Sequence, residues 1–296
     1  MNLTPKSKVL IQGITEPFSS THAARMKAYG TNVVAGVSPG EGGQTLHDIP
    51  VFDLVEQALE VVGSVDTTII FVPPYQAEDA ALEALAAGIR QIIIISSGVP
   101  PLDMVHLLRK SEATETLVVG PNSPGIIVPG KILLGTHASE FYTPGPVGIV
   151  SRSSTLTYEI ALELTKAGLG QSIGVSIGSD VIAGSSFIQW LQILDEDETT
   201  RAIVLVGETG GNSEEAAARY IAEAIDKPVI AYVAGCHAPA GKHWGHAGAL
   251  AQVVGRGADV GTAQSKLAAF KEAKVPVAKR PSQIPELVKK ALKKSG

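Results

Sequence analysis

The sequence predicts an α/β protein in which two doubly wound parallel sheets follow each other along the chain. Short runs rich in valine and isoleucine alternate with longer segments of helical apolar spacing. The predicted strands are apolar at almost every position, which is typical of parallel strands covered by helices on both faces. A Pro/Gly cluster at residues 142–146 interrupts this alternation, which then restarts. We therefore expect a boundary near Pro144, with domains over residues 1–144 and 145–296.

Each predicted strand of the first domain ends in turn residues and is followed by a helix. This order requires crossover connections, which are right-handed in nearly all parallel sheets. The strands are predicted at 9–11, 32–37, 67–72, 91–96 and 116–119, with one helix reaching residue 30 and others over 52–62, 77–87 and 102–109.

The second domain repeats the alternation without an evident sequence repeat. Its strands are predicted at 147–150, 173–177, 202–206, 229–233 and 275–278, and its helices at 155–167, 187–194, 214–225, 263–273 and 284–292.

Composition excludes several classes of protein. The 296 residues are 45% hydrophobic and 18% charged, and they carry a net charge of −5, so there is no basic surface for nucleic acid or an anionic membrane. Aromatic residues make up only 5%. A single cysteine, the lack of an apolar leader after Met1 and the shortness of all apolar runs predict a cytoplasmic protein without a membrane span.

Ligands of doubly wound sheets bind beyond the carboxyl ends of the strands, so the loops there are the candidate sites. The loop after the first strand, from Gly13 to His22, occupies the place of a glycine-rich phosphate loop. It keeps only Gly13, and Glu16 adds a negative charge where a pyrophosphate would lie. A nucleotide site and a plain strand-to-helix turn both remain open, and the spacing favours the turn.

Two later strand ends of the first domain, at 96–100 and 120–125, carry small polar residues. Glycine, proline, asparagine and serine are the usual turn residues. At one edge of a sheet they would equally line a cleft for a polar ligand. Composition does not decide between these interpretations.

In the second domain, the segment 151–158 joins a strand to a helix and is rich in hydroxyl groups. It fits an anion site at a helix N-terminus and equally a serine-capped helix with nothing bound. Glu208 lies at another strand end, where its carboxylate could hold one nitrogen of a histidine. A solvated loop acid is the alternative, and in isolation it is favoured.

His246 lies between Gly245 and the pair Ala247-Gly248, so little side-chain bulk surrounds its imidazole. The near-neutral pKa of imidazole makes it a competent nucleophile, although local composition alone favours an ordinary loop histidine. Cys236 follows the strand at 229–233, and a small buried thiol is favoured there over a nucleophile.

These segments occur in the same order and spacing in one known family. The chain resembles, over essentially its whole length, the α subunits of succinyl-CoA synthetase (succinate–CoA ligase). The resemblance is carried by the segments 120–122, 151–153, 155–159, 207–208 with 210–211, and 245–249, of which the last is the most specific. It implies a Rossmann-like CoA-binding domain followed by a flavodoxin-like domain, and it reverses the local interpretation of His246.

The resemblance also implies a mechanism. His246 would take a phosphoryl group from a nucleoside triphosphate and pass it to succinate, after which the CoA thiol displaces phosphate. Glu208 would hold the histidine ring, and Tyr158 would lie at the contact with the other subunit's substrate site. The phosphorylated histidine would be cradled by Ser153, Ser154 and Thr155. The resemblance further implies a β subunit with an ATP-grasp domain that binds ATP or GTP with Mg²⁺, in an αβ or α₂β₂ assembly. The lack of a Walker loop in this chain fits that division.

By the same resemblance, CoA would be bound by residues of the first domain and by the loop that follows its last strand. These residues are Gly13, Thr15, Glu16, Pro17, Phe18, Pro39, Glu41, Ile95, Ser96, Ser97 and Asn122.

The chain departs from the family pattern mainly in that domain. Glu16 and Ser19 replace glycines, Glu41 replaces a lysine, Ser97 a glutamate, Ser123 a cysteine and Ser154 a glycine. Two of these changes add negative charge near a polyanionic ligand.

Other functions remain open from the sequence. The same chemistry would suit the small subunit of a malate– or citrate–CoA ligase. The first domain could instead be the dinucleotide-binding module of an oxidoreductase, although the missing glycines and Glu16 argue against it. A third possibility is a non-catalytic partner of a β subunit with a degenerate CoA site.

Overall fold

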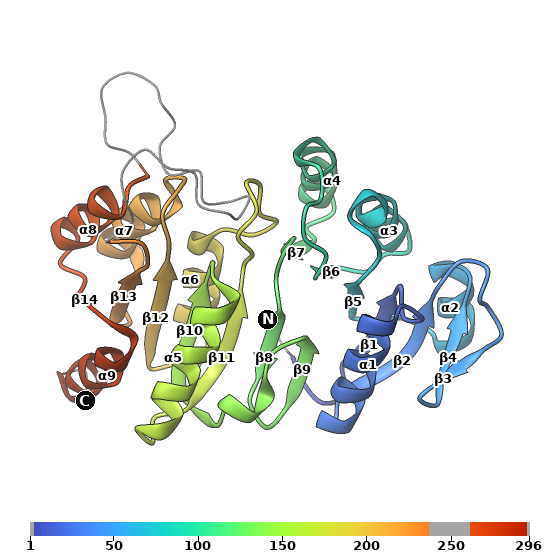
Figure 1. Ribbon diagram of the computed structural model, residues 1–296, viewed down its shortest axis with the longest axis horizontal. Coiled ribbons are helices and arrows are strands. Elements are labelled where there is room, and N and C mark those ends of the chain that lie inside the picture. Colours follow the sequence, from blue (N-terminus) through green and yellow to red (C-terminus); the bar gives the residue numbers. More distant parts are fainter. Residues whose placement is uncertain (1–2, 237–260, 295–296) are drawn as a thin grey trace.

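The computed structural model describes residues 3–236 and 261–294, which form two seven-stranded sheets side by side along the long axis of the molecule (Figure 1). The first sheet has the order β3-β4-β2-β1-β5-β6-β7, and every pair except β3–β4 is parallel. From β4 to β7 this is the doubly wound Rossmann order, which reverses between β1 and β5. Its strands are β1 (Lys8–Gln12), β2 (Asn32–Val37), β3 (Thr45–Leu46), β4 (Ile49–Phe52), β5 (Thr67–Ile70), β6 (Gln91–Ile94) and β7 (Leu117–Val119).

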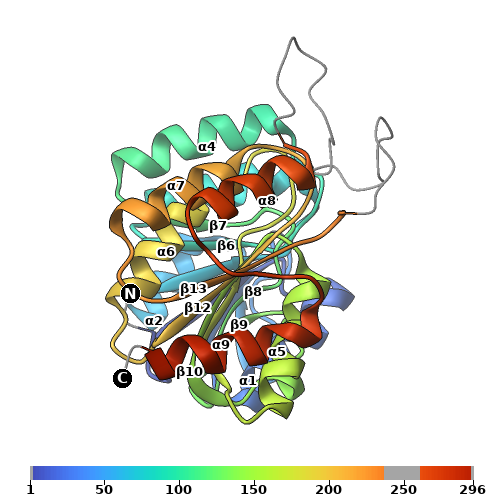
Figure 2. The same cartoon turned by 90° about the vertical axis from the view of Figure 1, so that its left-hand side faces the viewer.

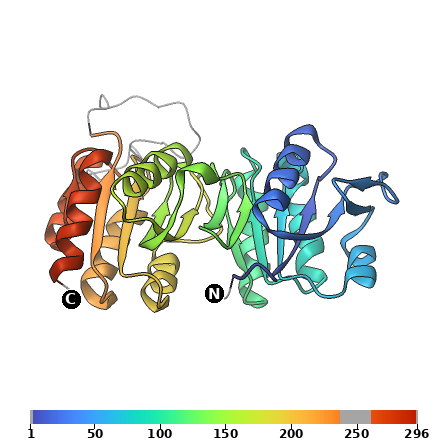
Figure 3. The same ribbon diagram turned by 90° about the horizontal axis from the view of Figure 1, so that it is seen from below.

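Helices cover both faces of this sheet because its strands present apolar side chains alternately to each side. Val9 and Ile11 of β1 lie in the core on the α1 face, whereas Leu10 lies in the core on the opposite face. Figure 3 shows α1 on one face of the sheet and the other helices on the opposite face. The helices are α1 (Pro17–Tyr29), α2 (Val55–Val62), α3 (Ala77–Ala86) and α4 (Pro101–Ala113), with a 3-10 turn η1 (Pro74–Gln76).

The second sheet has the order β14-β13-β12-β10-β11-β8-β9. From β11 to β14 the strands are parallel and follow the flavodoxin-like order, with β10 between β11 and β12. The strands are β8 (Gly125–Val128), β9 (Ile132–Gly135), β10 (Pro144–Ser151), β11 (Gln171–Ser176), β12 (Ala202–Gly207), β13 (Val229–Val233) and β14 (Val277–Ala278).

The helices of the second sheet also lie on both of its faces (Figure 2). One face carries α5 and α9, and the other carries α6, α7 and α8. The fold class predicted from sequence is thereby confirmed. The bounds are α5 (Ser154–Lys166), α6 (Phe187–Glu196), α7 (Ser213–Ala224), α8 (Ala263–Glu272) and α9 (Ile284–Lys294), with 3-10 turns η2 (Ser139–Phe141) and η3 (Pro281–Gln283).

The hairpin β8–β9 is a feature that the sequence analysis did not predict. It pairs antiparallel with β11 of the second sheet, yet its backbone also bonds to the first domain. The Thr31 hydroxyl donates to the Leu133 carbonyl at 2.8 Å, and the Gly130 N–H donates to the Tyr29 hydroxyl at 2.9 Å. The chain therefore changes sheet before Gly125, whereas the domain boundary near residue 144 stays a prediction.

The edge strands account for the other differences from the predicted elements. The helix predicted over 52–62 begins only at Val55, because Phe52 is the last residue of β4. The short strands β3 and β4 were not predicted, and they, with β8 and β9, make the sheets mixed at their edges rather than wholly parallel. Within the described residues, no helix is long and apolar enough to cross a membrane.

Candidate active site

The loop between β10 and α5 lies where the strand order of the second sheet reverses. Ser153 caps α5, because its hydroxyl accepts a hydrogen bond from the Leu156 N–H at 3.4 Å. Ser154 and Thr155 occupy the first turn, where backbone N–H groups have no partner within the helix and the positive end of the helix dipole lies. The three residues predicted to cradle phosphate thus share one helix N-terminus at the carboxyl edge of the sheet.

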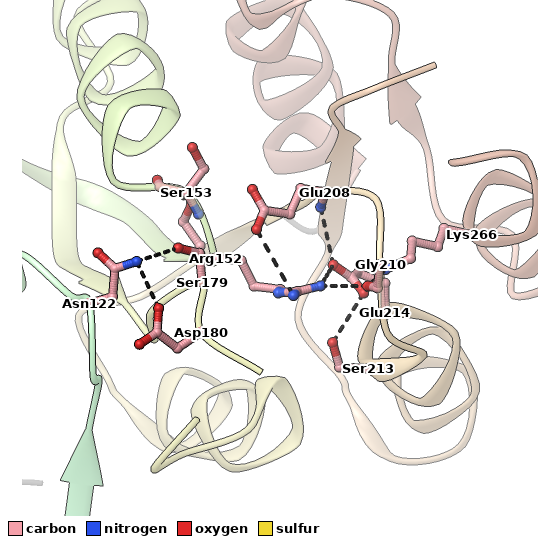
Figure 4. Close-up of polar contacts among 11 residues, drawn as sticks. Asn122, Arg152, Ser153, Ser179, Asp180, Glu208, Gly210, Ser213, Glu214 and Lys266 are labelled. Atoms are coloured by element: carbon pink, nitrogen blue, oxygen red, sulfur yellow. Dashed lines mark hydrogen bonds and ion pairs between the residues drawn. The ribbon is translucent and has the colours of Figure 1, made fainter. Parts of the chain in front are cut away.

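The guanidinium of Arg152 connects the ends of β10 and β12. Ser151 pairs with Val206, so residue 152 lies beside the end of the neighbouring strand. Arg152 Nη2 lies 3.9 Å from Glu208 Oε1, and Nη1 donates to Glu214 Oε1 at 3.2 Å and to the Gly210 carbonyl at 2.8 Å (Figure 4). The planar guanidinium suits this bridging position between two carboxylates.

A fully buried ion pair lies behind Arg152. The side chains of Glu214 and Lys266 are both 0% exposed, and the Lys266 ammonium donates to the Glu214 carboxylate and to the Gly210 carbonyl, the latter at 2.7 Å. Burial lowers the pKa of Lys266, and the attraction of Glu214 opposes this shift. With Arg152 and Glu208 included, two positive and two negative groups form one cluster.

The loop after β1 is held by neutral hydrogen bonds instead. The Thr15 hydroxyl donates to Ser38 Oγ at 2.9 Å. Gly13 has a φ of 78°, and a Cβ there would lie 3.0 Å from the Val72 nitrogen, so only glycine fits this turn without strain. This loop brings Thr15 beside the end of β2.

The residues that open α1 point towards solvent. Glu16 is the N-cap of α1 but its side chain makes no capping hydrogen bond, and Pro17 occupies the first turn. Phe18 is 60% exposed and packs edge-on against the ring of His22, with centroids 4.6 Å apart. The helix N-terminus is therefore accessible, with an acid and an aromatic ring at its mouth.

The loop after β2 carries Pro39 and Glu41. Asp53 organises it, because its Oδ1 accepts from the Gly40 N–H at 2.7 Å and from the Gly42 N–H at 2.9 Å. Pro39 is exposed, and the partly exposed Glu41 accepts a hydrogen bond from Gln44 at 2.9 Å.

The loops after β6 and β7 are joined to the second sheet through Asp180. Asp180 Oδ1 accepts from Asn122 Nδ2 at 2.9 Å (Figure 4). Its Oδ2 accepts from the Gly98 N–H at 3.1 Å. Ile95 and Ser96 are partly buried at the end of β6, and Ser97 beyond them is exposed. The Asn122 N–H donates to the Ser96 carbonyl at 2.8 Å, so the predicted CoA residues 95–97 and 122 form one cluster.

An open cavity of about 640 Å³ lies between α4 and the loops of the second sheet. Its lining combines Val118 from β7 with Arg152, Asp180 and Asn212 from the second domain. Of the charge cluster, Arg152 lines this space, which is bounded by both domains.

Tyr158 of α5 packs edge-on against the buried ring of His137, with centroids 5.7 Å apart. His137 Nε2 lies 2.9 Å from the Gly125 carbonyl and Nδ1 lies 2.9 Å from the Tyr142 hydroxyl. Since a carbonyl only accepts, Nε2 carries the proton and Nδ1 accepts from Tyr142. Burial lowers the pKa of His137 to about 4, against the effect of its bond to Gly125, so the ring is neutral near pH 7.

His246, the predicted nucleophile, lies outside the described residues. Cys236 is half-buried, and its thiol donates to the Val233 carbonyl at 3.2 Å. Among the described histidines, cysteines and acids, no group of three or more could hold a metal ion.

Comparison with known proteins relates both halves to one family. The family model of the CoA binding domain matches residues 4–98, and the CoA-ligase model matches residues 150–276. The succinate–CoA ligase [ADP-forming] subunit alpha 2 of Archaeoglobus fulgidus is 46% identical over 97% of this chain and 98% of its own length. The chain belongs to the CoA-ligase family that includes the succinate–CoA ligase α subunits.

A second relative is similarly close in sequence, and one solved structure shares the fold. The α subunit of malate–CoA ligase from Methylorubrum extorquens is 45% identical over 84% of this chain and 86% of its own length. ATP citrate lyase from Methanothrix soehngenii, solved in complex with citrate and coenzyme A, superposes with a TM-score of 0.89 at 24% identity. This chain covers 51% of that chain, and at this identity the likeness concerns the fold alone.

Four residues of the site received no role from the sequence analysis. Arg152 was part of a recognised segment, but its contacts with two acids could not be foreseen. Glu214 and Lys266 lie in two predicted helices that are far apart in sequence, and nothing in the sequence relates them to each other. Asp180 follows β11, so the rule that ligand loops follow strands would have identified it as a candidate.

Proposed function

We propose that this chain is the α subunit of a succinate–CoA ligase that forms succinyl-CoA from succinate, CoA and a nucleoside triphosphate, reversibly, through a phosphohistidine at His246. The observation that carries the proposal is that Glu208 and the N-terminus of α5 follow two adjacent parallel strands, β12 and β10. Arg152 lies between β10 and α5 at the carboxyl edge of the second sheet, and its guanidinium is 3.9 Å from the Glu208 carboxylate. Near-full-length similarity to named α subunits supports the same conclusion.

In this mechanism, a ring nitrogen of His246 attacks the terminal phosphorus and the nucleoside diphosphate leaves. A succinate carboxylate oxygen then takes the phosphoryl group and frees the imidazole, giving succinyl phosphate. The CoA thiol, losing its proton, attacks the acyl carbon and releases inorganic phosphate. Glu208 would accept a hydrogen bond from the N–H of the other ring nitrogen, so that the attacking nitrogen keeps its lone pair.

The N-terminus of α5 would hold the phosphoryl group while it is on the histidine. The hydroxyl groups of Ser153, Ser154 and Thr155, with the unpaired N–H groups of the first turn, are suitable donors. Tyr158, one turn further along α5, would lie at the contact with the partner subunit.

The loops after β1, β2 and β6, together with Asn122, would bind CoA. The exposed N-terminus of α1 and the free face of Phe18 are suitable for a polyphosphate and an adenine ring. Glu16 and Glu41 repel the negative charge of the CoA phosphates, so we expect weaker CoA binding than neutral or basic residues would give. A β subunit with an ATP-grasp domain would supply the nucleotide and Mg²⁺ in an αβ or α₂β₂ assembly.

Malate is the second candidate acid. It is supported by the 45% identity to a malate–CoA ligase α subunit. The two candidates share every step and differ only in which acid discharges the phosphoenzyme. A non-catalytic role would instead require that CoA fails to bind at the loops carrying Glu16 and Glu41.

The decisive experiment mixes the chain with its β subunit and ATP labelled at the γ-phosphate. We expect acid-labile, alkali-stable label on this chain, absent in His246→Ala and discharged by succinate with CoA. Discharge by malate but not succinate would select the second candidate. A chain that takes no label from a β subunit active with another α subunit would refute the phosphohistidine mechanism.

A further inference from the structure

The carboxylate of Glu214 is the centre of the charge cluster, and each of its two oxygens accepts two hydrogen bonds. Oε1 accepts from the Glu208 N–H at 3.1 Å and from Arg152 Nη1 at 3.2 Å (Figure 4). Oε2 accepts from the Ser213 hydroxyl at 3.0 Å and from the Lys266 ammonium. Four donors directed at two oxygens fix a buried carboxylate in one orientation.

The backbone that carries Glu208 is shaped around this side chain. A Cβ on Gly207 would lie only 2.6 Å from Glu214 Cγ and 2.9 Å from Oε1. The absence of a side chain at Gly207 therefore lets the carboxylate reach the end of β12 and bond to the next N–H. An ion pair that served only to fasten α7 to α8 would not require this contact.

Arg152 is shared unequally between the two acids. It lies 3.2 Å from Glu214 and 3.9 Å from Glu208. Without the negative charge of Glu214, the guanidinium would be attracted to Glu208 alone. Without the positive charge of Lys266, Glu214 would attract Arg152 more strongly and its own charge would lack a full counter-charge.

We propose that Glu214, supported by Lys266, is a positioning residue for Glu208. It fixes the backbone at residue 208 and limits the attraction of Arg152 for the Glu208 carboxylate, which leaves that carboxylate basic enough to hold the His246 ring. The inference rests on the proposed function, because only there does Glu208 orient a histidine.

The test uses the complete complex with its β subunit and three variants, Glu214→Gln, Lys266→Met and the double variant. Glu215→Gln is the matched control, since Glu215 is a buried acid next in sequence that bonds to Gly261 and Ser265. The measurements are thermal unfolding, the KM for ATP, and the rate of labelling of His246 as a function of pH.

We expect Glu214→Gln to slow labelling about 10- to 100-fold without changing the KM for ATP, because misplacement of about 1 Å costs on this order. The acid limb of its pH profile should move to lower pH, since Glu208 paired with Arg152 stabilises a protonated imidazole less. In Lys266→Met the limb should move to higher pH. The control keeps all four donors to the Glu214 carboxylate. Although the charge of Glu215 also acts on Lys266, Glu215→Gln should change the rate and the pH profile far less than Glu214→Gln.

The double variant separates positioning from stability. It leaves neither Glu214 nor Lys266 as a buried charge without its partner, so its unfolding temperature should be higher than those of the single variants. Labelling should nevertheless stay slow, and the acid limb of its pH profile should stay at lower pH than in wild type. A folded double variant with the wild-type rate and pH profile would overturn the proposal, as would equal effects in Glu215→Gln. If wild type itself takes no label at His246, the proposed function fails instead.

Discussion

The loops after β1 and β10 occupy equivalent places in two doubly wound sheets, at the point where each strand order reverses. Their construction differs. After β1, hydroxyl and backbone groups hold the chain, and Glu16 stands exposed at the helix N-terminus without capping it. After β10, Ser153 caps the helix, and Arg152 connects the loop to a cluster of buried charges.

The difference indicates which region tolerates change. A buried charge that loses its partner costs several kcal/mol, so the cluster behind Glu208 has a single stable arrangement. An exposed acid contributes little to stability, so Glu16 and Glu41 can be replaced at small cost to the fold. We expect substitutions in the second region to affect folding and phosphoryl transfer together, and those in the first to change CoA affinity alone.

Gly207→Ala, at the end of β12, should destabilise the buried charge cluster of the second region most severely. The added methyl group would overlap Glu214 Cγ, and the four donors around that carboxylate leave it no alternative position. We expect the free energy of unfolding to fall by about 3 kcal/mol, measured by urea denaturation. Shortening the neighbour should relieve the overlap, so the substitution should cost far less when made in Glu214→Ala. An equal cost in both backgrounds would contradict this explanation.

Low pH should destabilise the packing of His137 against the hairpin β8–β9. Burial lowers the pKa of His137 from 6.5 to about 4, so between these values the unfolded chain binds a proton that the folded chain does not. Stability from this group is therefore complete above pH 6.5 and falls as pH decreases, by up to about 3 kcal/mol near pH 4.

Urea denaturation of wild type and His137→Gln across this pH range checks the expectation, since the variant should lose most of this dependence. Burial, aided by Arg25, also lowers the pKa of His22 in the first region, but that ring is only half-buried. His22→Gln should therefore change the pH dependence less than His137→Gln. The reverse order would contradict the assignment.

Asp180→Ala should weaken the connection between the two domains, because Asp180 joins the loops after β6 and β7 to the second sheet. It removes an acceptor of the Asn122 amide, which keeps only its bond to Ser179 Oγ, and the acceptor of the Gly98 N–H. We expect a loss of about 2 kcal/mol in the free energy of unfolding and weaker CoA binding by isothermal titration calorimetry. The exposed Asp226→Ala serves as control. Unchanged CoA affinity in Asp180→Ala would show that the hydrogen bonds to Asp180 do not shape the CoA loops.

The central strands of both sheets were predictable because burial on two faces makes them continuously apolar. The edge strands were not, since β4 contains Pro50 and β3 has only two residues. The hairpin β8–β9 did leave a pattern, two apolar runs around Pro129-Gly130, but its pairing with the second sheet depends on contacts distant in sequence.

The candidate site divides in the same way. Ser153 and Glu208 follow strands, so the rule for doubly wound sheets places them at one edge. Glu214 begins a helix beside a second glutamate, a pattern typical of solvated acids near a helix N-terminus. Its burial arises only when α7 packs against α8 and brings Lys266, distant in sequence, to the same carboxylate.

Glu41→Lys should have the smallest effect and confine it to the first region. Reversing a partly exposed charge beside a polyanionic ligand should tighten CoA binding about three- to tenfold in calorimetry, with no loss of stability. The gain should shrink as salt is raised, because exposed charges are screened. Glu60→Lys, which makes the same charge change on the exposed side of α2, should leave affinity nearly unchanged. Equal gains in both variants would indicate that net charge, rather than the loop after β2, sets the affinity for CoA.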